Sequence, residues 1–242
     1  MNIISRITIF FVLTSVLIGE MHAKGSDTAT SEKSQIQVAV AHVLKANQQF
    51  VKQHNASYFL PFIQGQTPKA TVVTCVDSRV HSHAIDPHPD GDLFMVRDIG
   101  NQVASAEGSI EYGIRHLHTP LLLIVGHSMC GAVKAAMTDY SKLEPAIKHD
   151  LSTIHVPPGN PDNPMEVKNA VEVNVNEQVA LALKLFAAEL AQDKLIIIGA
   201  VYDFRNDYKQ GYGRLIFTNV NGESDPDKIK RALFLSKGVV TK

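Results

Sequence analysis

The strongest strand signal in the chain is the run LLLIVGHSMCG at residues 121–131. Its first five residues are all apolar, which is typical of a strand in a parallel sheet that is covered on both faces. The run then changes character, so that His127 and Cys130 follow directly on the buried strand. This order predicts a central strand that brings two polar, metal-ligating side chains to one edge of a sheet.

Similar apolar runs recur along the chain and alternate with segments of helical spacing. We expect strands over residues 70–74, 93–96, 195–198 and 215–220, and helices around residues 34–53, 104–117 and 167–190. Asn163-Pro164 is a start signal for the last of these helices. The alternation predicts an α/β fold with a mainly parallel central sheet, of four parallel strands plus an edge strand, flanked by helices.

The composition excludes several classes of protein. The 242 residues have 45% hydrophobic and 19% charged side chains, as ordinary globular domains do. The net charge is −1, so no overall positive field would draw the chain onto nucleic acid or an anionic membrane. Two cysteines cannot build a disulfide-rich scaffold, but they allow one disulfide, two free thiols or two metal ligands.

Residues 1–23 have the pattern of an export signal. Arg6 provides a positive start, an apolar core follows, and Ala23 is a small residue before a cleavage site. The core is shorter than the roughly 20 apolar residues of a membrane span, which favours cleavage over an uncleaved anchor. We expect a periplasmic protein with no membrane contact after cleavage, a flexible lead-in over residues 24–33 and a single domain over residues 34–242.

Polar clusters follow the expected strands. Cys75, Asp77 and Arg79 come after the first strand, and His127 and Cys130 after the third. Ligands bind at the carboxyl ends of strands in such sheets, so we expect Cys75, His127 and Cys130 to meet there. Two thiolates and one imidazole are a typical zinc set that leaves a fourth position for water.

Asp77 and Arg79 indicate how such a site would be activated. An ionised Asp77 can accept a hydrogen bond from zinc-bound water, and Arg79 can hold Asp77 through a two-point ion pair. The alternatives are a Cys75–Cys130 disulfide in an oxidising compartment, a merely structural ion pair, and a satisfied buried histidine. The residues alone favour zinc and leave the disulfide open.

Three motifs together resemble the β-class carbonic anhydrases. They are CVDSRV at residues 75–80, VRDIGN at residues 96–101 and GHSMCGAV at residues 126–133. The resemblance implies that Cys75, His127 and Cys130 bind one zinc ion and that Asp77 and Arg79 form the catalytic dyad. It further implies the reversible hydration of CO2 to bicarbonate and a proton through zinc-bound hydroxide.

The resemblance also implies a substrate pocket and an assembly. The substrate-binding positions that carry over are Gln66, Phe94, Ile99, Tyr112 and Gly131. In this family the pocket lies across a dimer interface, so we expect a homodimer or a dimer of dimers. The helix around residues 34–53 would then lie against the partner.

Two departures distinguish this chain within the family it resembles. Tryptophan is absent and Val72 stands at the corresponding place, which favours the subtype whose zinc keeps a water ligand. Asp98 stands where asparagine is usual, beside Arg97, and we expect it to alter a salt bridge or the pH response. The competing functions are a related zinc hydrolase of CS2 or COS and a non-catalytic, disulfide-bonded exported binding protein.

Overall fold

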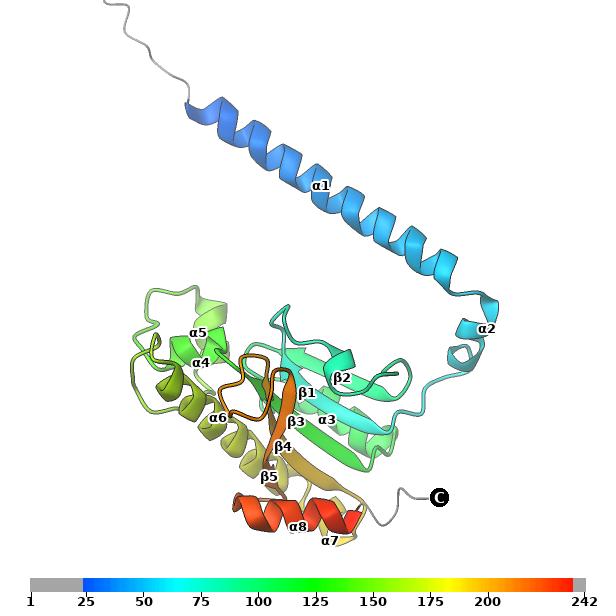
Figure 1. Cartoon of the computed structure of the whole chain (residues 1–242), viewed down its shortest axis with the longest axis vertical. Helices are drawn as coiled ribbons and strands as arrows, with labels where there is room; N and C mark the ends of the chain where they lie inside the picture. Colours follow the sequence, from blue (N-terminus) through cyan, green and yellow to red (C-terminus); the bar gives the residue numbers. More distant parts are fainter. Residues whose placement is uncertain (1–23, 237–242) are drawn as a thin grey trace, which may run out of the picture. The chain divides into compact units, whose positions relative to one another are not determined.

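The computed structural model describes residues 24–236 (Figure 1). The chain divides into an N-terminal helical unit that ends at Ile63 and a second unit that begins at Gln64. Within the described residues, none of the helices is both long enough and apolar enough to cross a bilayer.

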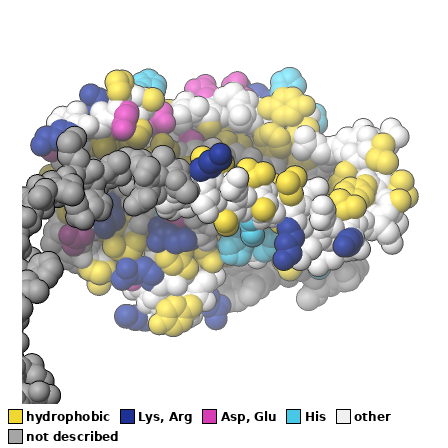
Figure 2. Space-filling model, turned by 90° about the horizontal axis from the view of Figure 1, so that it is seen from above, with side chains coloured by type: hydrophobic (Ala, Val, Ile, Leu, Met, Phe, Trp, Pro, Cys, Tyr) yellow, Lys and Arg dark blue, Asp and Glu magenta, His cyan; other side chains and the backbone are white. Residues whose placement is uncertain are grey.

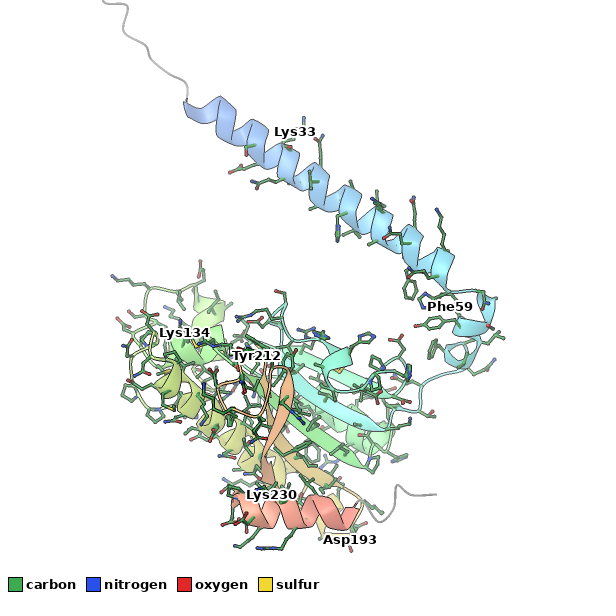
Figure 3. All side chains as sticks on the ribbon, in the orientation of Figure 1. Lys33, Phe59, Lys134, Asp193, Tyr212 and Lys230 are labelled. Atoms are coloured by element: carbon green, nitrogen blue, oxygen red, sulfur yellow. The ribbon has the colours of Figure 1, made fainter. Side chains whose placement is uncertain are left out.

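The N-terminal unit consists of α1 (Lys24–Gln53), α2 (Ala56–Phe59) and the 3₁₀-helix η1 (Leu60–Phe62). The lead-in expected to be flexible over residues 24–33 is therefore helical, since no proline or glycine interrupts residues 26–53. The side chains of α1 project freely around the helix, as Figure 3 shows near Lys33. Several are apolar, with Ile36 64% and Val43 65% exposed. Figure 2 shows hydrophobic side chains among those at the surface of the chain.

The second unit is built around a five-stranded sheet in the order β2-β1-β3-β4-β5. Its strands are β1 (Ala70–Cys75), β2 (Leu93–Asp98), β3 (Leu121–His127), β4 (Ile196–Asp203) and β5 (Arg214–Val220). The first four pair in parallel, and β5 is antiparallel to β4 at the edge. This confirms the expected sheet.

The parallel strands run further than their apolar cores suggest. Cys75, Asp98, His127 and Asp203 are the last residues of β1, β2, β3 and β4. Main-chain pairing continues to these positions, with Cys75 opposite Asp98 and His127 opposite Tyr202. The polar residues expected in loops after the strands therefore begin inside the sheet, where the backbone is held by its ladder.

The helices of this unit include η2 (Ser82–Ala84), α3 (Glu107–Glu111), a π-helical turn η3 (Tyr112–His116), α4 (Gly131–Ala136), α5 (Pro145–Leu151), α6 (Pro164–Leu185), α7 (Ala187–Ala191) and α8 (Pro226–Ser236). Asn163 caps α6 as expected, because its side chain accepts a hydrogen bond from the Met165 N–H. The helix expected to reach about residue 190 instead ends at Leu185, where Phe186 leaves the helical conformation.

Apolar side chains cover both faces of the sheet. On one face, Val179 and Phe186 of the α6 region pack with Leu122 and Ile124. On the other face, Ile229 of α8 packs in a cluster with residues of β1, β3 and β4. A parallel sheet buried in this way holds the ends of its strands firmly.

Asp98, which we expect to alter a salt bridge or the pH response beside Arg97, is hydrogen-bonded to the segment that follows β2. Neighbouring side chains on a strand point to opposite faces. Accordingly, Asp98 accepts hydrogen bonds from the Gln102 N–H at 2.8 Å and from the Ser105 hydroxyl. It thereby organises the turn that leads from β2 to α3. Burial raises the pKa of this carboxyl to about 6.

Asp98→Asn should therefore stabilise the protein above neutral pH. The folded-state pKa of Asp98 lies above its value of about 3.9 in an unfolded chain, so its charge destabilises the fold progressively as pH rises through about 4 to 6. Without the charge, an asparagine can still accept from the Gln102 N–H through its Oδ1, and its Nδ2 can donate to the hydroxyl oxygen of Ser105. Thermal unfolding should show a clear gain in Tm at pH 8 that shrinks at pH 5. The exposed Asp162→Asn should show no such trend, and equal gains at both pH values for Asp98→Asn would refute the explanation.

Candidate metal centre

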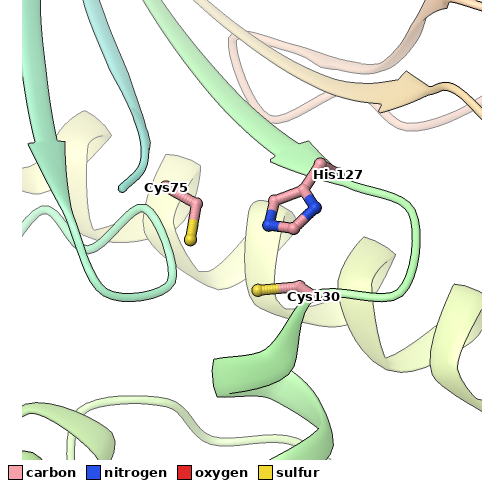
Figure 4. A group of neighbouring side chains, drawn as sticks. All are labelled: Cys75, His127 and Cys130. Atoms are coloured by element: carbon pink, nitrogen blue, oxygen red, sulfur yellow. The ribbon is translucent and has the colours of Figure 1, made fainter. Parts of the chain in front are cut away.

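Three side chains meet at the carboxyl edge of the sheet, as expected. The ligand atoms of Cys75, His127 and Cys130 all lie within 4.8 Å of one another (Figure 4). Cys75 ends β1, His127 ends β3, and Cys130 directly precedes α4. The turn between His127 and Cys130 places Met129 at a φ of 51°, which brings both side chains to the same point. Both cysteines are free thiols in the structure, so the disulfide alternative is not the arrangement found.

The orientation of His127 fits a metal ligand. Its Nδ1 lies 3.1 Å from the carbonyl oxygen of Ser128, so Nδ1–H donates there and Nε2 is left with a free lone pair. This Nε2 is buried without a hydrogen-bond partner. A buried imidazole nitrogen that lacks a partner is costly, and a metal ion among these three residues would satisfy it.

The two thiols form an electrostatically coupled pair. The hydrogen bond from Cys130 lowers the pKa of Cys75, and the same interaction, with deep burial, raises the pKa of Cys130. The Gly100 N–H points at the sulfur of Cys75 at 3.5 Å, which favours the thiolate further. Negative charge thus develops most readily at Cys75, and a bound cation would stabilise it on both sulfurs.

Asp77 and Arg79 form the two-point pair expected of them. Arg79 Nε donates to Asp77 Oδ1 at 2.8 Å, and Arg79 Nη2 donates to Oδ2 at 2.6 Å. The guanidinium holds the pKa of the Asp77 carboxyl well below its usual range. Asp77 Oδ2 lies 3.8 Å from His127 Nε2, so an ionised carboxylate stands beside the metal-ligand cluster while Arg79 restrains it.

Supporting contacts around the cluster were not predicted from the sequence. Arg97 donates to the carbonyl oxygens of Cys75, at 3.0 and 3.1 Å, and of Asp77, at 2.8 Å. The Ser128 hydroxyl donates to the buried Asp203 carboxylate at 2.9 Å. Arg97 lies in one of the motifs that carry the family resemblance, which was the available signal, whereas Asp203 lies outside those three motifs, and the partners of both residues depend on the tertiary fold.

The predicted pocket residues are divided between regions of the second unit. Ile99 packs against the core cluster that contains Cys75 and Cys130, and Gly131 begins α4 directly after Cys130. Phe94 and Tyr112 instead contact each other, with ring centroids 6.0 Å apart, and Gln66 is exposed. One chain alone therefore places two of these five positions beside the metal ligands.

The loop after Arg79 carries three histidines, His81, His83 and His88, whose side chains are exposed. The ring centroids of His81 and His83 lie 6.5 Å apart.

Comparisons with known proteins bear directly on this site. Residues 70–208, more than half of the chain, match the family model described as carbonic anhydrase. Carbonic anhydrase 2 of Mycobacterium tuberculosis is 34% identical over 147 residues, which cover 57% of this chain and 71% of the relative.

Two solved structures have the same fold. A Coccomyxa β-carbonic anhydrase in complex with acetazolamide has a TM-score of 0.62 at 22% identity, covering 82% of this chain and 97% of that one. A tetrameric β-carbonic anhydrase of the ascomycete Sordaria macrospora has a TM-score of 0.60 at 21% identity, covering 76% and 96%. The chain therefore belongs to the carbonic anhydrase family and has the fold of its β class.

Proposed function

We propose that this protein catalyses the reversible hydration of CO2 to bicarbonate and a proton, with one Zn²⁺ bound by Cys75, His127 and Cys130. Membership of the carbonic anhydrase family gives the reaction. The observation that carries the site assignment is the meeting of these three ligands beside an ionised Asp77. When bound, the zinc ion supplies a Lewis acid that makes water a nucleophile near neutral pH.

Asp77 has the role of orienting the attacking water. A carboxylate is an acceptor only, so Asp77 takes a hydrogen bond from that water and directs a lone pair of its oxygen toward CO2. Arg79 keeps Asp77 ionised and in place, since it occupies both carboxylate oxygens with donors. The pair is formed in the structure, and it supports the open subtype in which water has access to the metal.

The apolar positions Phe94, Ile99 and Tyr112 would bind the substrate. CO2 is small and uncharged, so an apolar wall admits it, whereas bicarbonate is disfavoured there once formed. Phe94 and Tyr112 contact each other and are not among the side chains that pack in the cluster with Cys75 and Cys130, which supports a pocket that a second copy of the chain completes. The exposed apolar side chains of α1 support the same assembly.

Asp77→Ala should lower kcat/KM for CO2 hydration about 10²-fold or more, because the water loses its orienting acceptor. Zinc content should stay at one per chain, since Asp77 is not one of the three ligands. Stopped-flow hydration assays and metal analysis of the same preparation measure both quantities. Asp227→Ala, at a carboxylate that is 78% exposed on α8, is the control and should remain fully active. A fully active, zinc-loaded Asp77→Ala enzyme would exclude the proposed role.

The assembly is testable in solution. Sedimentation equilibrium of the zinc-loaded protein should give a dimer or a dimer of dimers at micromolar concentration. A chain that stays monomeric there while retaining full activity would contradict a pocket shared between copies.

We also propose that the protein is exported to the periplasm, on the pattern of residues 1–23. When the whole chain is produced in a bacterial host and the cells are fractionated, activity should appear in the periplasmic fraction. Intact mass should correspond to a chain that begins at Lys24. Full-length protein confined to the cytoplasm would contradict the proposal.

A further inference from the structure

The ring of Phe204 contacts both Arg79 and His127, one of the residues of the metal-ligand cluster. The guanidinium carbon of Arg79 is 4.9 Å from the centroid of this ring. The ring is also nearly parallel to that of His127, with centroids 6.1 Å apart and planes 25° apart. Among the ring contacts of the described residues, Phe204 is the one side chain that contacts both Arg79 and a residue of the metal-ligand cluster.

The backbone holds Phe204 firmly in this place. Phe204 directly follows Asp203, whose buried carboxylate accepts hydrogen bonds from Ser128 Oγ at 2.9 Å and from the N–H groups of Asp207 and Tyr208, each at 2.9 Å. The ring also packs edge-on against Tyr202, with centroids 5.7 Å apart. A residue whose backbone is held by these hydrogen bonds and whose ring packs against a neighbouring ring gives a well-positioned surface for another side chain.

Arg79 is the more exposed member of the Asp77–Arg79 pair. Its side chain is 50% exposed, whereas that of Asp77 is 18% exposed. Long exposed side chains lose considerable rotamer freedom when they are held in one geometry. An aromatic ring can reduce this freedom, because it attracts the face of the guanidinium while the N–H groups at its edge remain free to donate.

We propose that Phe204 is a positioning residue for CO2 hydration, which holds Arg79 by a cation–π contact so that its edge stays directed at Asp77. The ring face orients the arginine, the arginine orients the carboxylate, and the carboxylate orients the attacking water. Phe204 itself touches none of the reacting atoms. This inference rests on the proposed function, and it assigns a role to a residue outside the Cys-x-Asp-x-Arg and His-x-x-Cys motifs.

Substitutions at Phe204 separate this role from simple packing. Phe204→Leu keeps an apolar side chain but removes the ring face, and Phe204→Tyr keeps the face. We expect kcat/KM to fall roughly two- to fivefold in Phe204→Leu, as the loss of a partly exposed cation–π contact predicts. Phe204→Tyr should stay close to the wild-type value. The loss should appear in kcat, with zinc content and Tm near wild type in both variants.

A double-mutant cycle identifies Arg79 as the route of the effect. In an Arg79→Ala background, Phe204→Leu should cause no further loss, since the guanidinium that it positions is gone. Equal losses in the Leu and Tyr variants, an undiminished loss in the Arg79→Ala background, or loss of zinc from Phe204→Leu would each overturn the proposal.

The contact also has a readout that does not depend on activity. The ring current of Phe204 should shift the side-chain Nε–H NMR resonance of Arg79 upfield, with the assignment made by its loss in Arg79→Lys. The shift should vanish in Phe204→Leu and persist in Phe204→Tyr. An unchanged resonance in Phe204→Leu would overturn the inference even in an active enzyme, whereas a wild-type protein with this shift but without CO2 hydration would contradict the proposed function instead.

Discussion

The parallel pairing of β1 with β3 places the carboxyl ends of two buried strands side by side, and the candidate metal centre is built at that junction. The register pairs Thr74 with Val125, so Cys75 and His127 follow almost level with each other. Cys130 joins them after one turn, which Met129 closes at positive φ. Because both faces of the sheet are covered, the three ligands are held by a rigid backbone before any metal arrives.

Burial explains why the Cys75, His127 and Cys130 side chains favour a bound cation. A thiolate or an imidazole nitrogen that is removed from water without a partner raises the free energy of the fold, and His127 Nε2 has no hydrogen-bond partner. The surrounding contacts prepare the site for a cation: the Gly100 N–H favours the Cys75 thiolate, and the Ser128 carbonyl fixes the imidazole. Arg97 ties Cys75 to Asp77 through their carbonyl oxygens, so the metal ligands and the catalytic pair are parts of one network.

Sequence patterns predicted the parts of the structure that depend on local signals. The apolar runs before Cys75 and His127 predicted buried strands, and Asn163 predicted the start of α6. Both kinds of signal, apolar periodicity and helix capping, depend only on residues that are close together in the sequence. Contacts between distant segments were not accessible in this way. Nothing near Phe204 in the sequence, for example, indicates its contact with Arg79. The separation of Phe94 and Tyr112 from the metal ligands likewise appears only once the chain is folded.

The most direct measurement of the central claim is zinc K-edge X-ray absorption of the purified native protein, combined with metal analysis. We predict one zinc ion per chain, with two sulfur scatterers at about 2.3 Å and one imidazole nitrogen at about 2.0 Å. A metal-free protein in which Cys75 and Cys130 are joined to each other would contradict it.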